Sequence, residues 1–468
     1  MRAAIFLLTA FWASAAPIRV ESGMLEGVPG GLPGITVYRG VPYAAPPVGA
    51  LRWMSPAPTA AWTGVRHADS FGPRCMQGTA GLAGNSEDCL YLNVWTKGAG
   101  KRPVMLWLHG GGFTGGAGSQ ALFDGEMLAA KGAVVVTINY RLGVFGFFAA
   151  KDLTGNYGLL DSIGALQWVH KNIAAFGGDP ENVTVFGESA GATMAGCLTA
   201  SPLAKGLFRR AIAESGNFTR NLMRLERAQS AGAQLLEKTG ATSIEQLRMK
   251  TAAEIMENGR GTGPIVDGIV LTGQPIEIYE QGKANAVDLL LGANSDEGAS
   301  SLQRTGAELF TNQAKRRFGA DADRYLALYP AGSDAEANKS QAASFRDEVG
   351  YQARAWARLG RGKTYVYYFT HEPPYSPVQP WRGAFHTAEI PYVFHNFERG
   401  RTWVDEDEFL AQQMSDYWYR FAATGDPNGG GLPRWPEFRD GVIVLGEPTD
   451  PAPDKARVEF WDSQRTKH

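Results

Sequence analysis

Residues 183–191 read V-T-V-F-G-E-S-A-G and constrain the fold more than any other stretch of the chain. A β-branched, apolar run passes directly into the pattern G-x-S-x-G. A helix-like segment, residues 192–200, follows until Pro202 stops it. Such a strand-turn-helix corner lifts one serine above a sheet, and glycines flank it because larger residues would collide with the strand or the helix. The pattern predicts that Ser189 is a nucleophile, the alternative being a tight structural turn.

The rest of the chain alternates apolar strands with helical patterns. Predicted strands cover residues 104–108, 134–138, 210–214, 288–291 and 365–369, and predicted helices cover residues 160–174, 222–238, 243–258, 408–423 and most of 306–360. Continuous apolar strands are typical of a parallel sheet buried on both faces, so we expect an α/β fold whose mostly parallel central sheet has helices on both sides. Residues 18–26 and 35–38, joined by a turn at 28–34, predict a small N-terminal antiparallel hairpin. No repeat or linker is evident, and residues 16–468 are expected to form one domain.

The first 15 residues predict export. Arg2 precedes an apolar stretch, residues 3–12, and Ala13-Ser14-Ala15 forms an A-x-A cleavage site, the pattern of a signal peptide; an ordinary buried first strand is the alternative. We therefore expect a secreted or periplasmic protein, with no later segment long and apolar enough to span a membrane. The chain has three cysteines, and in an exported protein Cys75 and Cys89 suggest a disulfide, with Cys197 as a buried thiol.

Charge and metal-binding patterns point to few partners. The formal net charge is -2, which gives no indication of binding to nucleic acid or to an anionic membrane surface. Neither a C-x-x-C pair nor an H-E-x-x-H motif occurs, so no metal site is predicted.

A serine hydroxyl needs a base to take its proton and an acid to orient that base. On this type of fold the chain order is serine, acid, histidine. Glu297 follows the strand at 288–291, and Asp296 beside it is the competitor, with a turn-forming role as its other interpretation. His386 lies in a glycine-containing loop between a strand and a helix, as the base should. The other histidines after Ser189 fit less well, because they lie in a surface loop, in an apolar run or at the C-terminal end: His371, His395 and His468.

Residues 109–113, H-G-G-G-F, follow a buried strand. Consecutive glycines at this place can direct backbone N–H groups toward an oxyanion, as in esterases and lipases. The stretch also fits the dinucleotide fingerprint G-x-G-x-x-G, which requires an acidic residue at the end of the next strand. That strand ends in Asn139-Tyr140-Arg141, without an acid, so the oxyanion interpretation is favoured.

Together these motifs resemble the type B carboxylesterases, the cholinesterase-like branch of the α/β-hydrolases, over nearly the whole mature chain. The matching segments, in family order, are residues 86–94, 109–113, 139–141, 176–180, 186–191, 296–298, 385–390 and 424–428.

The resemblance implies a carboxylic ester hydrolase that needs no cofactor and forms an acyl-enzyme. It implies a triad of Ser189, Glu297 and His386, and oxyanion donors from the amides of Gly111, Gly112 and Ala190. It also implies a Cys75–Cys89 disulfide, buried ion pairs Arg52–Glu87 and Arg141–Asp161, and a hydrogen bond from Ser215 near Glu297.

Two departures bear on specificity. The loop from Cys75 to Cys89 is short and has no tryptophan, whereas the longer loop of cholinesterases carries the tryptophan that faces choline. Residues 261–264, G-T-G-P, stand where acetylcholine-selective relatives carry bulky aromatics. We therefore expect a small-molecule ester substrate that is neutral, with a short-chain or aromatic acyl group, and a monomer or weak homo-oligomer. The alternatives are a lipase, a specialised xenobiotic esterase, and a non-catalytic binding or adhesion protein.

Overall fold

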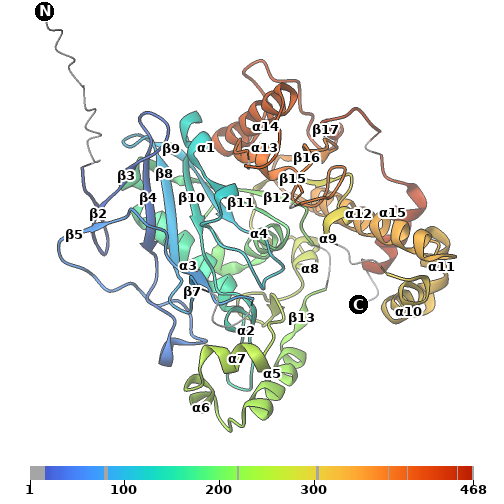
Figure 1. The fold of residues 1–468 in the computed structure, drawn as a ribbon, viewed down its shortest axis with the longest axis horizontal. Helices are drawn as coiled ribbons and strands as arrows, with labels where there is room; N and C mark the ends of the chain where they lie inside the picture. Colours follow the sequence, from blue (N-terminus) through green and yellow to red (C-terminus); the bar gives the residue numbers. More distant parts are fainter. Residues whose placement is uncertain are drawn as a thin grey trace, which may run out of the picture.

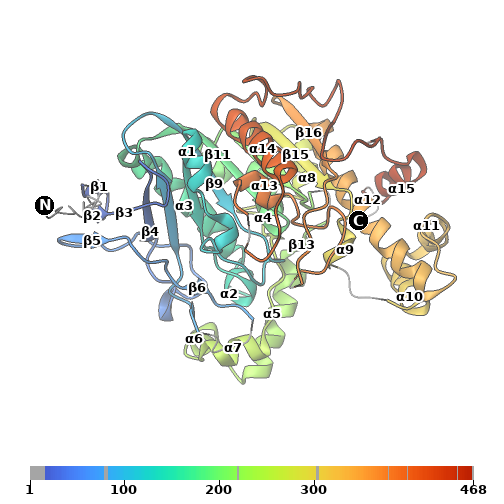
Figure 2. The same cartoon turned by 45° about the horizontal axis from the view of Figure 1, so that its top comes forward.

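A computed structural model describes residues 16–78, 83–218, 221–301, 305–377, 379–397, 399–450 and 452–465. The predicted signal peptide, residues 1–15, and His468 lie outside the described residues. Figure 1 shows a central sheet with helices on both sides, and Figure 2 shows the same arrangement turned by 45°.

The central sheet has ten strands in the order β17-β16-β15-β12-β11-β9-β10-β8-β4-β3. All neighbours from β10 to β17 in that order are parallel, and β8, β4 and β3 complete the sheet with antiparallel pairs. This confirms the predicted mostly parallel sheet. The strands are β3 (Val28–Pro29), β4 (Thr36–Pro42), β8 (Tyr91–Thr96), β9 (Arg102–Leu108), β10 (Val134–Ile138), β11 (Gly178–Glu188), β12 (Arg210–Glu214), β15 (Asp288–Asn294), β16 (Thr364–Phe369) and β17 (Ile443–Leu445).

Alternate side chains of β9 enter two separate hydrophobic cores. Leu106 and Leu108 pack on the face covered by α3 and α4, while Met105 and Trp107 pack on the face covered by α1, α13 and α14. This is the period-two pattern of a strand buried on both sides. The helices are α1 (Glu126–Lys131), α2 (Gly143–Gly146), α3 (Tyr157–Asn172), α4 (Ala190–Ala200), α5 (Leu225–Thr239), α6 (Ile244–Arg248), α7 (Ala252–Asn258), α8 (Pro275–Glu280), α9 (Gly298–Ser301), α10 (Ala307–Phe318), α11 (Ala322–Leu328), α12 (Asp334–Leu359), α13 (Ile390–Phe394), α14 (Asp405–Thr424) and α15 (Lys455–Arg465).

The predicted N-terminal hairpin forms with different partners. Residues 18–26 fold back on themselves as β1 (Ile18–Val20) and β2 (Gly23–Glu26), which belong to a separate three-stranded sheet with β5 (Val65–His67). The segment assigned to a turn contains β3, which pairs with β4. The prediction that 18–26 pairs with 35–38 was therefore wrong, because a two-residue turn at Glu21 and Ser22 closes a tighter hairpin.

One predicted helix is also divided. Residues 243–258 form α6 and α7 rather than a single helix. The break falls where Thr251 begins a second capping box: its side chain accepts a hydrogen bond from the amide of Glu254, whose carboxylate accepts one from the amide of Thr251. This second N-terminal signal starts a new helix instead of continuing the first.

The G-x-S-x-G turn is held by backbone contacts that exclude side chains. A Cβ atom on Gly191 would lie 1.8 Å from the carbonyl oxygen of Leu108, and one on Gly187 would lie 2.6 Å from the same oxygen. Ser189 sits between them at φ 56° and ψ -116°, as the N-terminal cap of α4. Its amide donates a hydrogen bond of 2.8 Å to the carbonyl of Glu214 at the end of β12. The turn is thus fixed to the ends of two neighbouring strands.

We expect Gly191→Ala to lower the free energy of unfolding by about 1–3 kcal/mol, the usual cost of forcing an atom into a packed site. Gly350→Ala is the matched control, because Gly350 lies within α12 and its Cβ would meet nothing within 4 Å. Alanine there should be neutral or stabilising by up to about 1 kcal/mol. Urea unfolding of both variants measures the difference, and equal stability of the two would contradict the close approach.

Candidate functional site

Glu297, His386 and Ser215 meet beyond the ends of the parallel strands. The Oε2 atom of Glu297 lies 2.5 Å from Nδ1 of His386, and its Oε1 atom accepts hydrogen bonds from the Ser215 hydroxyl at 2.5 Å and the Asn294 amide at 2.9 Å. Glu297 is fully buried. Ser215 directly follows β12, and its φ of 56° lets the chain turn away from the sheet. The structure therefore brings these three predicted residues together.

Asp296 contacts the loop that carries His386, and not the imidazole. Its Oδ2 atom accepts hydrogen bonds from the Ser295 hydroxyl at 2.6 Å and the Ala384 amide at 3.1 Å, while its own amide donates to the Ala384 carbonyl. The two acidic neighbours are thus divided in role: Glu297 faces the histidine, and Asp296 holds the loop in place.

The other described histidines after Ser189 have separate carboxylate partners. Nε2 of His371 lies 2.8 Å from Asp407, and Nε2 of His395 lies 2.7 Å from Glu408. Both carboxylates belong to α14. These two histidines therefore bind elements outside the Glu297 cluster.

Glu188, the residue before Ser189, also contacts His386. Its Oε1 atom lies 3.0 Å from Nε2 of the imidazole, on the side opposite Glu297. The sequence patterns did not predict this contact. The signal available was a carboxylate at the buried end of a strand, where a charge needs a partner.

The glycine-rich loop passes close to the same turn. A Cβ atom on Gly110 would lie 3.3 Å from Cβ of Ser189 and 2.6 Å from Oε2 of Glu188, so only glycine fits. Gly111 and Gly112 are exposed and have φ angles of 110° and 61°. Ala190, whose amide is the third predicted donor, begins α4 immediately after Ser189. The predicted donors thus come from two segments that meet at Ser189, and a helix N-terminus favours negative charge there.

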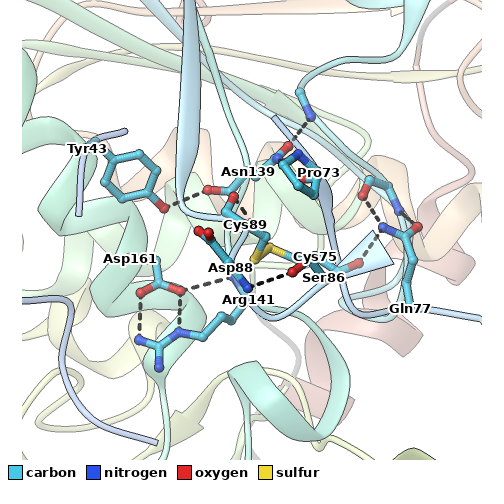
Figure 3. The surroundings of a disulfide bond; sticks show 12 residues. Tyr43, Pro73, Cys75, Gln77, Ser86, Asp88, Cys89, Asn139, Arg141 and Asp161 are labelled. Carbon is cyan, nitrogen blue, oxygen red and sulfur yellow. Dashed lines mark hydrogen bonds and ion pairs between the residues drawn. A yellow bond between two sulfur atoms is a disulfide. The ribbon is translucent and has the colours of Figure 1, made fainter. Parts of the chain in front are cut away.

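Two neighbouring segments support the glycine-rich loop. The Tyr140 hydroxyl donates a 2.6 Å hydrogen bond to the carbonyl of His109, and their rings stack with centroids 4.4 Å apart. Gln77 brackets Gly116, donating to its carbonyl at 2.8 Å and accepting from its amide at 2.9 Å. Gln77 belongs to the loop closed by the disulfide, so that loop helps to fix the backbone beside the site (Figure 3).

The disulfide and both implied ion pairs are present. Cys75 and Cys89 are bonded and Cys197 is a free, buried thiol. Arg141 makes hydrogen bonds of 2.7 and 2.8 Å to the two oxygens of buried Asp161 (Figure 3). Arg52 binds Glu87 through two hydrogen bonds of 2.6 and 2.7 Å and donates to the carbonyls of Leu247, Arg248 and Lys250. These contacts connect the disulfide loop to the C-terminal end of α6.

Four buried carboxylates interact electrostatically in one cluster: Glu188, Glu214, Glu297 and Glu389. Two of them, Glu188 and Glu297, contact the imidazole. Burial, together with the charges of Glu188 and Glu297, raises the pKa of Glu389 to about 8. Burial likewise raises the pKa of Glu214 well above its usual value. Burial lowers the pKa of His386, but the charges of Glu188 and Glu297 outweigh it and raise that pKa well above 6.5. The two carboxylates that contact the ring therefore favour an imidazolium on His386.

A cleft of about 1070 Å³ opens beside the first turn of α4. Its inner end includes Phe113 of the glycine-rich loop and Thr193, whose amide and hydroxyl both donate to the carbonyl of Ser189. The outer part of the cleft is lined by residues at the start of α5 and at the ends of α10 and α15. The inner end of the cleft thus reaches the first turn of α4, which begins directly after Ser189.

The family comparison fits this geometry. The model of the carboxylesterase family matches residues 14–342 and 334–461. The chain is 38% identical to a fumonisin B1 esterase of Sphingopyxis macrogoltabida, over 93% of this chain and 88% of that protein. It is 34% identical to the para-nitrobenzyl esterase of Bacillus subtilis, over 91% and 95% of the two chains.

A solved para-nitrobenzyl esterase structure superposes with a TM-score of 0.82 at 34% identity, covering 92% of this chain and 96% of the other. The chain belongs to the carboxylesterase family. It has the α/β-hydrolase fold and is a carboxylic ester hydrolase. Within the described residues of this carboxylesterase, no helix combines the length and hydrophobicity needed to cross a bilayer.

The contact between Glu188 and His386 predicts a change in pH dependence. An imidazole must be neutral to accept a proton, so kcat/KM should rise with pH through the pKa of His386. Glu188→Gln removes one of the charges that raise this pKa, so the rising limb should move to lower pH by about one unit. Steady-state profiles with a neutral nitrophenyl ester measure the shift.

The control is Glu408→Gln, which changes the same kind of contact at His395. It should leave the rising limb in place. An unmoved limb in Glu188→Gln would mean that Glu188 does not influence the titrating group.

Proposed function

We propose that this carboxylesterase hydrolyses small, neutral esters through Ser189, His386 and Glu297. The observation that carries the proposal is the position of the Glu297–His386 pair beside the Ser189 turn, with Glu188 contacting the imidazole from the turn itself. Glu297 is held by Ser215 and the backbone of Asn294. It is therefore oriented to fix the imidazole and to stabilise its cation.

The chemistry proceeds in two halves. The Ser189 hydroxyl attacks the ester carbonyl while its proton passes to Nε2 of His386, and the amides of Gly111, Gly112 and Ala190 stabilise the tetrahedral oxyanion. The imidazolium gives its proton to the departing alcohol, which leaves an acyl group on Ser189. A water molecule, deprotonated by His386, then attacks the acyl carbonyl and releases the acid. The reaction requires no cofactor.

The loops beside Ser189 favour neutral esters over choline esters. A quaternary ammonium group is recognised by an aromatic face, an attraction of about 0.5–2 kcal/mol, and the loop from Cys75 to Cys89 has no tryptophan to provide one. Gly263 packs against Phe113, where a Cβ atom would lie 3.0 Å from the ring. Since glycine adds no bulk there, acyl groups larger than acetyl can be accommodated.

We also propose that the enzyme is exported, with residues 1–15 as its signal peptide and 16–468 as the hydrolase domain. The Cys75–Cys89 disulfide supports this, because disulfides persist mainly in oxidising compartments.

The nucleophile can be tested by covalent labelling. An organophosphate should inactivate the enzyme and appear on Ser189 in peptide mass spectrometry. Ser189→Ala should fold, resist labelling and lose roughly three orders of magnitude or more in turnover of 4-nitrophenyl butyrate. The control Ser230→Ala, on the exposed side of α5, should be labelled at Ser189 and should turn over the ester as the wild type does. Label on any other residue would remove Ser189 from the role.

The acid can be tested by exchanging neighbours. Glu297→Gln should lower kcat by several orders of magnitude, because a neutral amide cannot stabilise the imidazolium. Asp296→Asn keeps the size of its side chain and should cost far less, since Asp296 binds only loop groups among its described contacts. Stopped-flow or steady-state kinetics on one ester give both values. The reverse ranking would assign the acid to Asp296.

A further inference from the structure

The cleft beside Ser189 is positively charged at its outer end. Its lining contains four arginines and two carboxylates: Arg224, Arg227, Arg317, Arg465, Glu226 and Glu348. The whole chain, in contrast, has 45 basic and 47 acidic residues. The excess of positive charge is therefore a local property of the cleft.

Two of the four arginines are already paired. Arg317 lies 2.6 Å from Glu348, and Arg465 forms an ion pair with Glu280. The first pair joins α10 to α12 and the second joins α15 to α8. The helices α10, α12 and α15 are drawn at the right of Figures 1 and 2. The carboxylate partners neutralise much of the charge of these two arginines.

Arg224 and Arg227 form no ion pair within the part of the chain that the structure describes. Both side chains are exposed, and both lie at the start of α5 on the opposite side of the cleft. Arg224 is the N-terminal cap residue of this 15-residue helix, so the positive end of the helix dipole adds to their charge. The negative charge of Glu226, which lies between them in the sequence, offsets only one of the two positive charges. This side of the cleft can therefore accept a negative group.

The inner end of the cleft is different, because its lining there is uncharged: Phe113, Thr193, Asn217, Thr262, Gly263 and Pro264. An ester group at Ser189 would thus have neutral surroundings in the cleft, while a substituent that reaches outward would approach the arginines. A guanidinium binds a carboxylate through two parallel hydrogen bonds, which makes this the anion it recognises with good geometry.

We infer that the enzyme prefers esters that carry a carboxylate remote from the scissile bond, and that Arg224 and Arg227 bind this carboxylate. The inference rests on the proposed function, because it names the substrate class of the same site. It narrows the proposed substrate class: the part of the ester near Ser189 stays neutral, and the substituent that reaches the arginines carries a negative charge. Cationic esters are disfavoured further.

The experiment compares esters that differ only in one distant charge. The first pair is a 4-nitrophenyl hemiester of a dicarboxylic acid and the same ester with its free carboxylate methylated. A series from adipate to sebacate covers the unknown reach and avoids the shorter hemiesters, whose own carboxylate attacks the ester. A second pair places the carboxylate in the alcohol part, as in the butyrate esters of 3-hydroxybenzoate and of its methyl ester.

The expected result is a kcat/KM at least about fivefold higher for the carboxylate form in one of the pairs, at low ionic strength. The double variant Arg224→Gln/Arg227→Gln should bring this ratio close to one. Its kcat/KM for the methylated ester should stay within about twofold of the wild-type value. Arg434→Gln/Arg439→Gln removes the same charge from exposed residues outside the cleft and should keep the ratio. Raising the salt to about 0.3 M should reduce the wild-type ratio, because exposed charges are screened.

A ratio at or below one in both pairs would overturn the inference, and so would a ratio that the Arg224/Arg227 variant leaves unchanged. Turnover of the methylated ester that depends on Ser189 would then still support the proposed function. If neither form of the ester were hydrolysed, both the inference and the proposed function would be wrong. A choline ester of the same acyl group should be the poorest substrate, and a preference for it would contradict both assignments.

Discussion

The close approach of the β11–α4 turn to the end of β9 is the contact on which the site depends. The carbonyl oxygen of Leu108 occupies the space where Gly187 and Gly191 would have side chains. Because the turn cannot relax, Ser189 is held at a positive φ and Glu188 is placed opposite His386. Gly110 in turn must lack a side chain because Glu188 and Ser189 fill its surroundings. One backbone contact thus determines the positions of the candidate nucleophile, the glycine-rich loop and a carboxylate partner of the imidazole.

Burying the carboxylates near His386 costs desolvation free energy, which the structure offsets with hydrogen bonds. Moving a charge out of water is expensive unless it is paired or protonated. Glu214 accepts a hydrogen bond of 2.8 Å from the indole of Trp418, and Glu389 accepts one of 2.5 Å from the side-chain amide of Asn294. The raised pKa of each of these two glutamates favours its protonated form. Glu188 and Glu297 instead face the imidazole. Burial raises the pKa of Glu188 as well, while the nearby charge of His386 lowers it, so the imidazole offsets part of the cost of burying this carboxylate.

The sequence predicted those parts of the fold that depend on local patterns. The buried strands and the turn at Ser189 follow from apolar runs and from residues at strand ends. The choice of Glu297 over Asp296 came instead from the family resemblance, and the catalytic role of Glu297 stays a prediction. The tighter hairpin at Glu21 and the break between α6 and α7 were missed because two local signals competed within a few residues, and only packing decides between them. The contact of Glu188 with His386 joins positions 198 residues apart, one at the end of β11 and one in the loop before α13, and no pattern within either segment specifies it.

The charged cleft was beyond sequence analysis for a related reason. Its arginines come from three segments, at the start of α5 and at the ends of α10 and α15, and each is unremarkable in its own helix. Only the packing of these late elements beside the sheet brings them to one cleft. The residues around the ester group, in contrast, lie at the ends of the central strands, where the sheet fixes them. In the proposed mechanism, reaction chemistry and substrate choice therefore depend on different parts of the fold. The outer helices can then change in charge without disturbing the contacts of Ser189, Glu297 and His386.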